Sequence, residues 1–164
     1  VEILKIEKPM HNDLIVYYFE DMEDITYSHG KTSTLNRGLS ITKDHPIYKS
    51  DGTNKIWVLD PETLKEIRFI EVLTNRSKIK NINELEYIDG KIYANTYQFN
   101  RDVIIVINPL NGVVERVIDF SGIRDRVAKK PDLDVMNGIA YFDGKIFVTG
   151  KNWDKLFEVE VVSK

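Results

Sequence analysis

Two carboxylates, Glu84 and Glu86, stand two residues apart and form the pair whose spacing is best suited to acid–base chemistry. On a β-strand, residues i and i+2 share one face, so both carboxylates point either into a central channel of the fold or to solvent. We expect one of the two to make a structural hydrogen bond, an interpretation that the sequence favours over a part in catalysis.

The composition of the 164 residues argues against several other kinds of site. The chain has no cysteine, which excludes disulfides, thiolate nucleophiles, cysteine-ligated zinc and iron–sulfur clusters. Its three histidines, His11, His29 and His45, have unrelated spacings that do not fit a zinc site. A net charge of −3 favours no nucleic-acid partner. No apolar run approaches the roughly 18 residues that a membrane-spanning helix needs.

Short segments rich in β-branched and aromatic residues dominate the sequence and predict an all-β fold. The clearest are Lys55–Leu59, Lys91–Ala94, Val103–Ile107, Lys145–Val148 and Leu156–Val161. Turn residues bound them: Asp51-Gly52, Asp89-Gly90, Asn111-Gly112 and Asp143-Gly144. Asp-Gly and Asn-Gly pairs supply the positive φ angles that two-residue hairpins need. Helical periodicity is nearly absent, and the best candidate is a short turn around residues 122–129.

The turns and strands also repeat along the chain. Tyr87–Tyr93 recurs 54 residues later as Tyr141–Phe147, and Asp60–Leu64 recurs 48 residues later as Asn108–Gly112. A period of this length with four short strands in each unit is typical of one blade of a β-propeller. The repeat therefore predicts propeller blades within the all-β class.

The repeat divides the chain into four parts. Residues 1–37 are predicted to be the remnant of an early blade and a connecting loop, with strands at Glu2–Ile6 and Leu14–Phe19. Residues 38–82 form one blade, residues 83–136 a blade with a long loop, and residues 137–164 a last blade that lacks its fourth strand. Closed propellers typically have 4–8 blades. We therefore expect this chain to supply about three blades and part of another in a larger ring.

Two segments closely resemble a known family. Asn83–Asn95 and Asp134–Glu158 are similar to the C-terminal blades of plant- and bacterial-type glutaminyl-peptide cyclotransferases, which are five-bladed propeller enzymes. The resemblance spans about residues 39–162. It implies an acyltransferase that cyclises the N-terminal glutamine of peptides to pyroglutamate and releases ammonia. It also implies that this reaction uses neither a metal nor another cofactor.

The resemblance assigns roles to individual residues. Asn83 matches the asparagine that holds the polar head of the substrate. Lys151 matches a lysine beside the catalytic carboxylate, where a cation lowers the pKa of that carboxylate or binds the oxyanion. Tyr97 and Arg37 stand where the family has tryptophans, so the pocket keeps one aromatic wall and gains a cation. Asn137 is either a neighbour of this substrate pocket or a residue that caps a loop.

The glutamate that transfers the proton in the family lies in an early Tyr-Phe-Gly-Glu-Gly-Leu-type segment, which has no match in this chain. We expect that segment to precede Val1, in blades carried by a companion chain or by an earlier part of the same protein. The 164 residues alone are then expected to be inactive. Relatives are commonly exported, so the resemblance points to the secretory pathway or another extracytoplasmic compartment, which the sequence itself does not assign.

Each candidate residue also has a purely structural interpretation. Asn83 would close a turn before a strand, Lys151 would be a solvated charge, and Tyr97 would pack in a blade. Trp57 and Trp153 stand among apolar strand residues and are expected to pack between blades. For the whole protein, the alternative to an enzyme is a non-catalytic propeller that serves as a binding platform, because fold does not dictate function.

Overall fold

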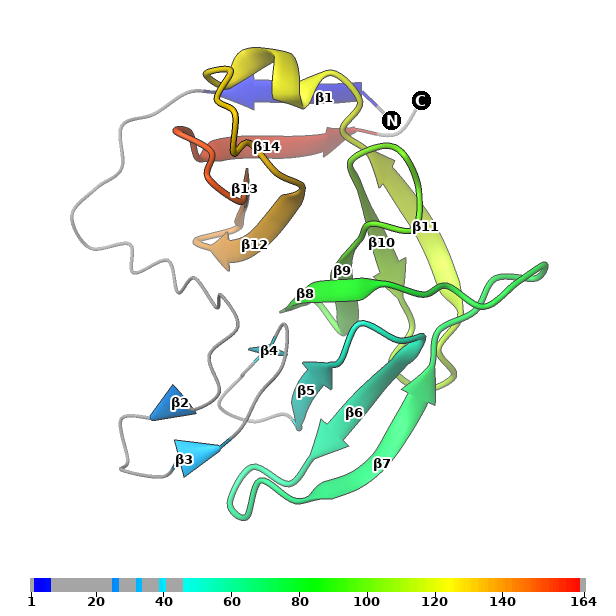
Figure 1. Ribbon diagram of the computed structural model, residues 1–164. Helices are drawn as coiled ribbons and strands as arrows, with labels where there is room; N and C mark the ends of the chain where they lie inside the picture. Colours follow the sequence, from blue (N-terminus) through cyan, green and yellow to red (C-terminus); the bar gives the residue numbers. More distant parts are fainter. Residues whose placement is uncertain (1, 7–24, 27–31, 34–38, 41–45, 163–164) are drawn as a thin grey trace.

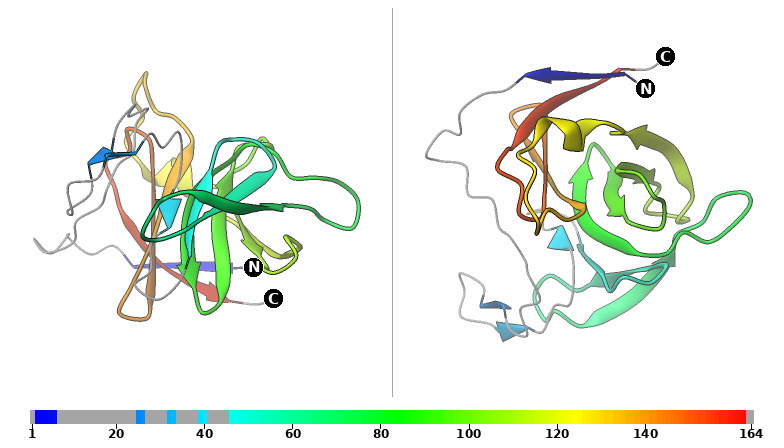
Figure 2. Two further views of the ribbon diagram at one scale, coloured as in Figure 1. Left: turned by 90° about the horizontal axis from the view of Figure 1, so that it is seen from below. Right: turned by 45° about the horizontal axis from the view of Figure 1, so that its top comes forward.

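The computed structural model of the protein describes residues 2–6, 25–26, 32–33, 39–40 and 46–162. Most of these residues form three four-stranded antiparallel sheets that spread around a common middle (Figure 1). Figure 2 shows the same sheets from two further directions. This arrangement confirms the prediction of an all-β fold of the propeller type.

The sheets follow one another along the chain. The first contains β4 (Leu39–Ser40), β5 (Ile47–Ser50), β6 (Lys55–Leu59) and β7 (Glu66–Glu71). The second contains β8 (Ile82–Ile88), β9 (Lys91–Thr96), β10 (Val103–Ile107) and β11 (Val114–Asp119). The third contains β12 (Met136–Phe142), β13 (Lys145–Gly150), β14 (Phe157–Val162) and β1 (Glu2–Ile6). The other described elements are the paired strands β2 (Ile25–Thr26) and β3 (Thr32–Ser33) and the 3-10 turn η1 (Ile123–Arg126).

The first strand of each sheet lies toward the middle of the molecule, and β8 contacts both β4 and β12 there (Figure 1). The outermost strands, β7, β11 and β1, lie at the periphery. The neighbourhood of β8 and β12 is the part of the fold that matters most for the site, because it brings two equivalent strand starts together.

The strand β1 differs from its predicted place. Glu2–Ile6 pairs with β14, from Glu2 opposite Val162 to Ile6 opposite Glu158, and so forms the fourth strand of the third sheet. The sequence placed this segment in the remnant of an early blade. An unpaired β14 would leave a row of backbone N–H and C=O groups without partners, which the N-terminal strand satisfies. The second segment expected there, Leu14–Phe19, lies outside the described residues.

Two of the four predicted turns are the expected two-residue hairpins. Asp89-Gly90 joins β8 to β9 with φ angles of 47° and 80°, and Asp143-Gly144 joins β12 to β13 with φ angles of 51° and 74°. Positive φ at both positions is what a type I′ turn requires. Asp51-Gly52 and Asn111-Gly112 instead belong to longer connections, in which only the glycine has a positive φ. The short turn predicted around residues 122–129 is η1.

Two apolar clusters fill the spaces between the sheets. Strand β10 contributes to both, since Ile105 and Ile107 face the first sheet while Ile104 and Val106 face the third. All five residues of β10 are buried, which explains why its sequence is continuously apolar instead of alternating. The second sheet is therefore held from both sides and fixes the relative positions of its neighbours.

The two tryptophans behave differently. Trp153 lies in the cluster between the second and third sheets, 7% exposed, as predicted. Trp57 does not pack between the described sheets, because its neighbours Ile56 and Val58 fill that space and its own ring lies on the opposite face of β6. It packs edge-on against Phe69 there, with ring centroids 5.4 Å apart. Within the described part of the chain, no helix has the length and apolarity to cross a membrane.

Candidate functional site

The inner strand of the second sheet begins with a β-bulge. Ile82 lies opposite Thr96 and Leu85 lies opposite Ala94, so the two residues between, Asn83 and Glu84, share one partner position on β9. A bulge inserts one extra residue and turns the side chains around it out of the regular alternation. The Asn83 side chain therefore departs from the regular alternation of the strand residues that follow it.

The third sheet repeats this bulge at the equivalent place. Met136 lies opposite Gly150 and Ile139 lies opposite Val148, so that Asn137 and the glycine after it share one partner position on β13. A Cβ atom on that glycine would lie 2.6 Å from the Thr149 Cγ2 atom, which explains why the bulge at this position needs a residue without a side chain. The repeat found in the sequence is thus also a repeat of local backbone geometry.

The two bulges bring Asn83 and Asn137 into direct contact. Asn83 Nδ2 donates a hydrogen bond to Asn137 Oδ1 at 2.6 Å. The backbone carbonyl of Asn83 accepts a hydrogen bond from the Ser50 hydroxyl at 2.5 Å. Asn83 is only 9% exposed and lies within β8, so it does not close a turn before the strand. After this bond, an amide oxygen of Asn83 and an amide N–H of Asn137 keep capacity for a ligand.

Lys151 and Tyr97 occupy equivalent positions as well, each being the first residue after the second strand of its sheet. The backbone N–H of Lys151 donates to the carbonyl of Val135 at 3.0 Å, just before β12 begins. The backbone N–H of Tyr97 donates to the carbonyl of Asn81 at 3.3 Å, just before β8 begins. Both residues therefore lie at the end of the sheets where the asparagine pair lies. Tyr97 is 39% exposed, which argues against the interpretation that it packs inside a blade.

Arg37, the remaining residue assigned to the site from the sequence, lies outside the described residues. The structure thus brings four of the five assigned residues to one end of the second and third sheets, which are Asn83, Tyr97, Asn137 and Lys151.

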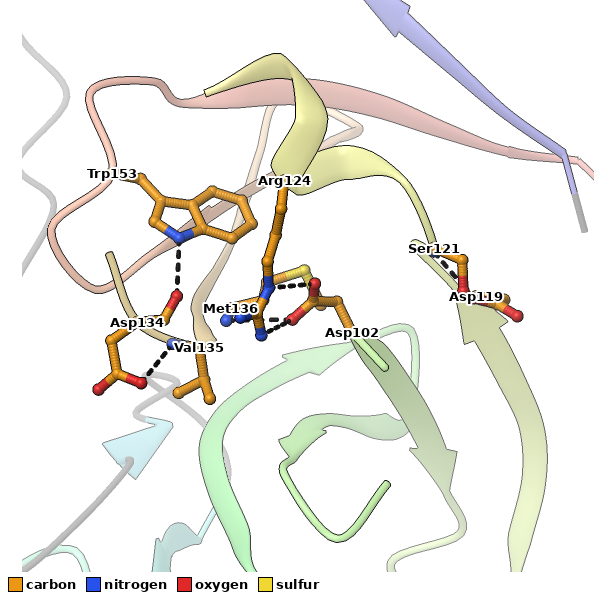
Figure 3. A network of polar contacts seen from close by, with 8 residues as sticks. All are labelled: Asp102, Asp119, Ser121, Arg124, Asp134, Val135, Met136 and Trp153. Carbon is orange, nitrogen blue, oxygen red and sulfur yellow. Dashed lines mark hydrogen bonds and ion pairs between the residues drawn. The ribbon is translucent and has the colours of Figure 1, made fainter. Parts of the chain in front are cut away.

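The start of β12 is held by a polar network that the sequence did not reveal (Figure 3). Asp102, just before β10 and 8% exposed, accepts two hydrogen bonds of 2.6 Å from the Arg124 guanidinium. The same carboxylate accepts a bond of 3.3 Å from the backbone N–H of Met136. The bonds to Asp102 raise the pKa of Arg124. Because Met136 precedes Asn137, Asp102 positions an asparagine of the site from the neighbouring sheet.

A second neighbour that the sequence did not single out is Asn95. Its Oδ1 atom accepts a hydrogen bond of 3.2 Å from the backbone N–H of Gly138, at the bulge of β12. Asn95 is 2% exposed, and its Nδ2 atom is buried without a partner among the described residues. An amide that follows the apolar residues of β9 is the signal that could have identified it, since buried polar groups are normally hydrogen-bonded.

The two glutamates of β8 lie next to this site. Glu86 accepts a hydrogen bond of 3.0 Å from the backbone N–H of Tyr141, so one of the pair makes the structural bond that was expected. Burial raises the pKa of Glu86 to about 7, although the Tyr141 bond opposes this change. Burial, together with the charge of Glu86, raises the pKa of Glu84 to about 8. A carboxyl group able to hold a proton at neutral pH thus follows Asn83 directly.

Comparison with known sequences identifies the family. The sequence profile of the glutamine cyclotransferase family matches residues 15–161, nearly the whole chain. The chain belongs to the glutamine cyclotransferase family.

Individual members agree with this assignment. Over 124 residues, the chain is 35% identical to the glutaminyl-peptide cyclotransferase of Arabidopsis thaliana, covering 73% of this chain and 38% of the plant protein. The crystal structure of Myxococcus xanthus glutaminyl cyclase is 32% identical and superposes with a TM-score of 0.70, covering 79% of this chain and 58% of that one.

The fold has a wider likeness too. The WD40 β-propeller domain of Doa1, at 16% identity, matches 82% of this chain and 40% of its own with a TM-score of 0.50, which concerns the fold alone.

This glutamine cyclotransferase family member spans only part of the length of its relatives, 38% of the plant protein and 58% of the bacterial structure. The four site residues that the fold gathers come from two adjacent blades. Among the described residues, no group of three or more His, Asp or Glu side chains is placed to hold a metal ion.

Proposed function

We propose that this glutamine cyclotransferase family member takes part in converting the N-terminal glutamine of peptides to pyroglutamate, with release of ammonia and without a metal in the reaction. One observation carries the proposal: the Asn83–Asn137 pair lies at the same end of two adjacent sheets as Lys151 and Tyr97. The family membership of the chain gives that arrangement its chemical meaning.

The reaction is an intramolecular substitution at an amide carbon. The α-amino nitrogen of the substrate attacks the side-chain carboxamide carbon, a C–N bond forms, and negative charge develops on the amide oxygen. The bond from that carbon to the side-chain nitrogen then breaks, and ammonia leaves with the proton that the amine gave up. The enzyme must therefore hold the folded substrate, stabilise the oxyanion and carry one proton.

In this proposal each described residue meets one of these needs. The amide oxygen left over on Asn83 accepts a hydrogen bond from the substrate amine, and the amide N–H left over on Asn137 donates to a substrate oxygen. The Lys151 ammonium supplies positive charge for the oxyanion or for the catalytic carboxylate. The Tyr97 ring, 39% exposed, forms a wall beside the aliphatic part of glutamine.

The proton carrier is the part of the site that we assign to another segment. The family glutamate has no match in Val1–Lys164, so we propose that a companion chain or a further part of the protein supplies it with the remaining blades. The peptide substrate would then bind between that segment and the end of the sheets described above.

The test is ammonia release from a peptide that begins with glutamine, measured with the native protein and everything that co-purifies with it. We expect turnover, and we expect Lys151→Ala and Asn83→Ala each to lower kcat about 100-fold, the usual cost of removing a group that stabilises an oxyanion. Lys129→Ala, which removes an exposed lysine from the loop after η1, is the matched control and should leave kcat unchanged.

The alternative, a binding platform without catalysis, predicts a different result. It would be supported by binding of Gln-initiated peptides with no ammonia release under any condition. The site assignment would be wrong if Lys151→Ala and Asn83→Ala unfolded the protein with no separate loss of turnover, so thermal unfolding is measured for both variants.

A further inference from the structure

A cavity of about 580 Å³ opens between the second and third sheets. Its walls come from the loop between β9 and β10, from the segment between β11 and η1, and from the first residues of β12. All of these wall segments belong to the described part of the chain. The volume falls in the range of pockets that enclose small ligands, which suits two or three peptide residues.

One wall of the cavity is aromatic. Tyr97 and Phe99 line it with exposed fractions of 39% and 40%. Val135 and Met136 form the facing wall at the start of β12. The exposed Phe99 ring leaves apolar area in water, which a bound apolar side chain would cover.

The arginines of the cavity are ion-paired. Asp102 and Arg124 line its floor and form the bidentate ion pair drawn in Figure 3, with both hydrogen bonds at 2.6 Å. Arg101, at the rim, forms an ion pair with Asp119 at 3.2 Å. A ligand therefore finds apolar surface and two ion-paired arginines in this cavity, with the Asp125 carboxylate as the remaining charged group of the lining.

The cavity adjoins the proposed site through Tyr97, which lines it, and through residues next to the two asparagines. Its lining residue Thr96 pairs with Ile82, the residue before Asn83, and its lining residue Met136 directly precedes Asn137. Tyr97 belongs to both. A peptide whose first residue contacts the two asparagines would therefore pass its next residues into the cavity.

We propose that this cavity binds the residues that follow the N-terminal glutamine of the substrate and selects peptides with an aromatic or large apolar side chain there. The inference rests on the proposed function and adds a specificity to it. Phe99 is the specificity residue, because its ring lines the cavity as exposed apolar surface while it has no part in the proton or oxyanion chemistry.

The experiment compares two peptides, Gln-Phe-Ala and Gln-Gly-Ala, with the native protein and its variants. We expect kcat/KM to be higher for Gln-Phe-Ala, and Phe99→Ala to reduce this preference about threefold to tenfold, as the loss of an aromatic contact does. The change should lie mainly in KM. Leu110→Ala is the matched control, since Leu110 is 85% exposed in the turn at the opposite end of the second sheet, and it should leave both values unchanged.

The outcomes separate the two proposals. Turnover of both peptides with no preference, or a preference that survives in Phe99→Ala, overturns the subsite and leaves the proposed function standing. A loss of preference in Leu110→Ala of the same size also overturns it. Absence of turnover with both peptides overturns the proposed function and the subsite together.

Discussion

The second and third sheets share one backbone plan but divide the chemistry between them. Each begins with an asparagine in a bulge, and each joins its first two strands through an Asp-Gly hairpin. The residues that follow the asparagines differ, with Glu84 and Glu86 on β8 where β12 has Gly138 and Ala140. The second sheet thus offers side-chain acceptors, and the third offers backbone N–H donors.

The hydrogen bonds between the sheets follow this division. The N–H groups of Met136, Gly138 and Tyr141 donate to side chains of the second sheet and its loops, which are Asp102, Asn95 and Glu86. The equivalent positions of the described third sheet supply no such acceptors to the second. The repeated units are therefore not interchangeable, because backbone N–H groups of β12 are bonded by side chains of the second sheet.

The loops after the second strand of each sheet show the same contrast. In the third sheet the loop turns inward, and Trp153 is 7% exposed with its Nε1–H bonded to the carbonyl of Asp134 at 3.0 Å. In the second sheet the loop leaves the rings of Tyr97 and Phe99 about two-fifths exposed, at 39% and 40%. One loop thus contributes to packing, and the other presents apolar surface to the cavity.

The Asp102 carboxylate connects the second sheet to the first residue of β12, so its removal tests the contact between the two sheets. Asp102→Ala would leave the Arg124 guanidinium and the Met136 N–H without their partner, so we expect the free energy of unfolding to fall by about 3 kcal/mol. Denaturant unfolding monitored by tryptophan fluorescence measures this loss. Arg101→Ala is the matched control, because its ion pair with Asp119 lies within the second sheet and is mostly exposed.

We expect Arg101→Ala to cost less than about 1 kcal/mol, as exposed ion pairs do. Equal losses for Asp102→Ala and Arg101→Ala would contradict the view that Asp102 links the two sheets. In an active preparation, Asp102→Ala should also weaken turnover through a displaced Asn137.

The inward turn of the third sheet can be tested at Gly150. A Cβ atom there would overlap the Trp153 ring, whereas the equivalent residue of the second sheet, Thr96, already carries a side chain. We expect Gly150→Ala to lower the free energy of unfolding by about 2 kcal/mol, since overpacking a buried site forces neighbours to move. Thr96→Ala removes a hydrogen bond to the carbonyl of Lys80 and should cost about 1 kcal/mol.

Thermal unfolding of the two variants, with near-ultraviolet circular dichroism to report on Trp153, measures the difference. If Gly150→Ala proved as stable as the parent protein, the Trp153 ring would have room that the structure does not give it. The comparison between an inward and an outward loop would then lose its physical basis.

Local features of this fold were the part that the sequence could predict. The Asp89-Gly90 hairpin could be predicted because these residue types tolerate positive φ. Strand β10 could be predicted from the β-branched run Val103–Ile107. The repeat then indicated which asparagines are equivalent, and Asn83 and Asn137 do meet. These features depend on residues close together in the sequence or on the repeat length, so they can be predicted from a single sequence.

Contacts between segments that are far apart in the sequence could not be predicted in this way. The pairing of Glu2–Ile6 with β14 joins the two ends of the chain, and the sequence carries no signal for which free edge a terminal strand will choose. Asp102 and Asn95 could not be identified as links between the sheets from the sequence. Their partners on β12 are backbone N–H groups, which every residue except proline has. The register of β6 turns Trp57 to the face of the first sheet that points away from the second sheet, and this side could not be predicted from the sequence.

The carboxyl pair that distinguishes β8 from β12 makes the stability of the protein depend on pH. The pKa of Glu84 is raised to about 8 in the folded protein from an ordinary value of 4.5, so the unfolded chain loses this proton first as the pH rises. Stability is then lost between about pH 4.5 and pH 8, because the unfolded state binds fewer protons there. Glu84→Gln keeps the shape and removes the titration.

We therefore expect Glu84→Gln to stabilise the protein at pH 8 by on the order of 3 kcal/mol more than at pH 5, measured by denaturant unfolding at both values. Glu160→Gln, at an exposed position on β14, should show no such difference between the two pH values. A stabilisation by Glu84→Gln that is equal at pH 5 and pH 8 would mean that Glu84 ionises as freely as a surface glutamate. Glu84 would then not be protonated at neutral pH, and β8 and β12 would differ only in their hydrogen bonds.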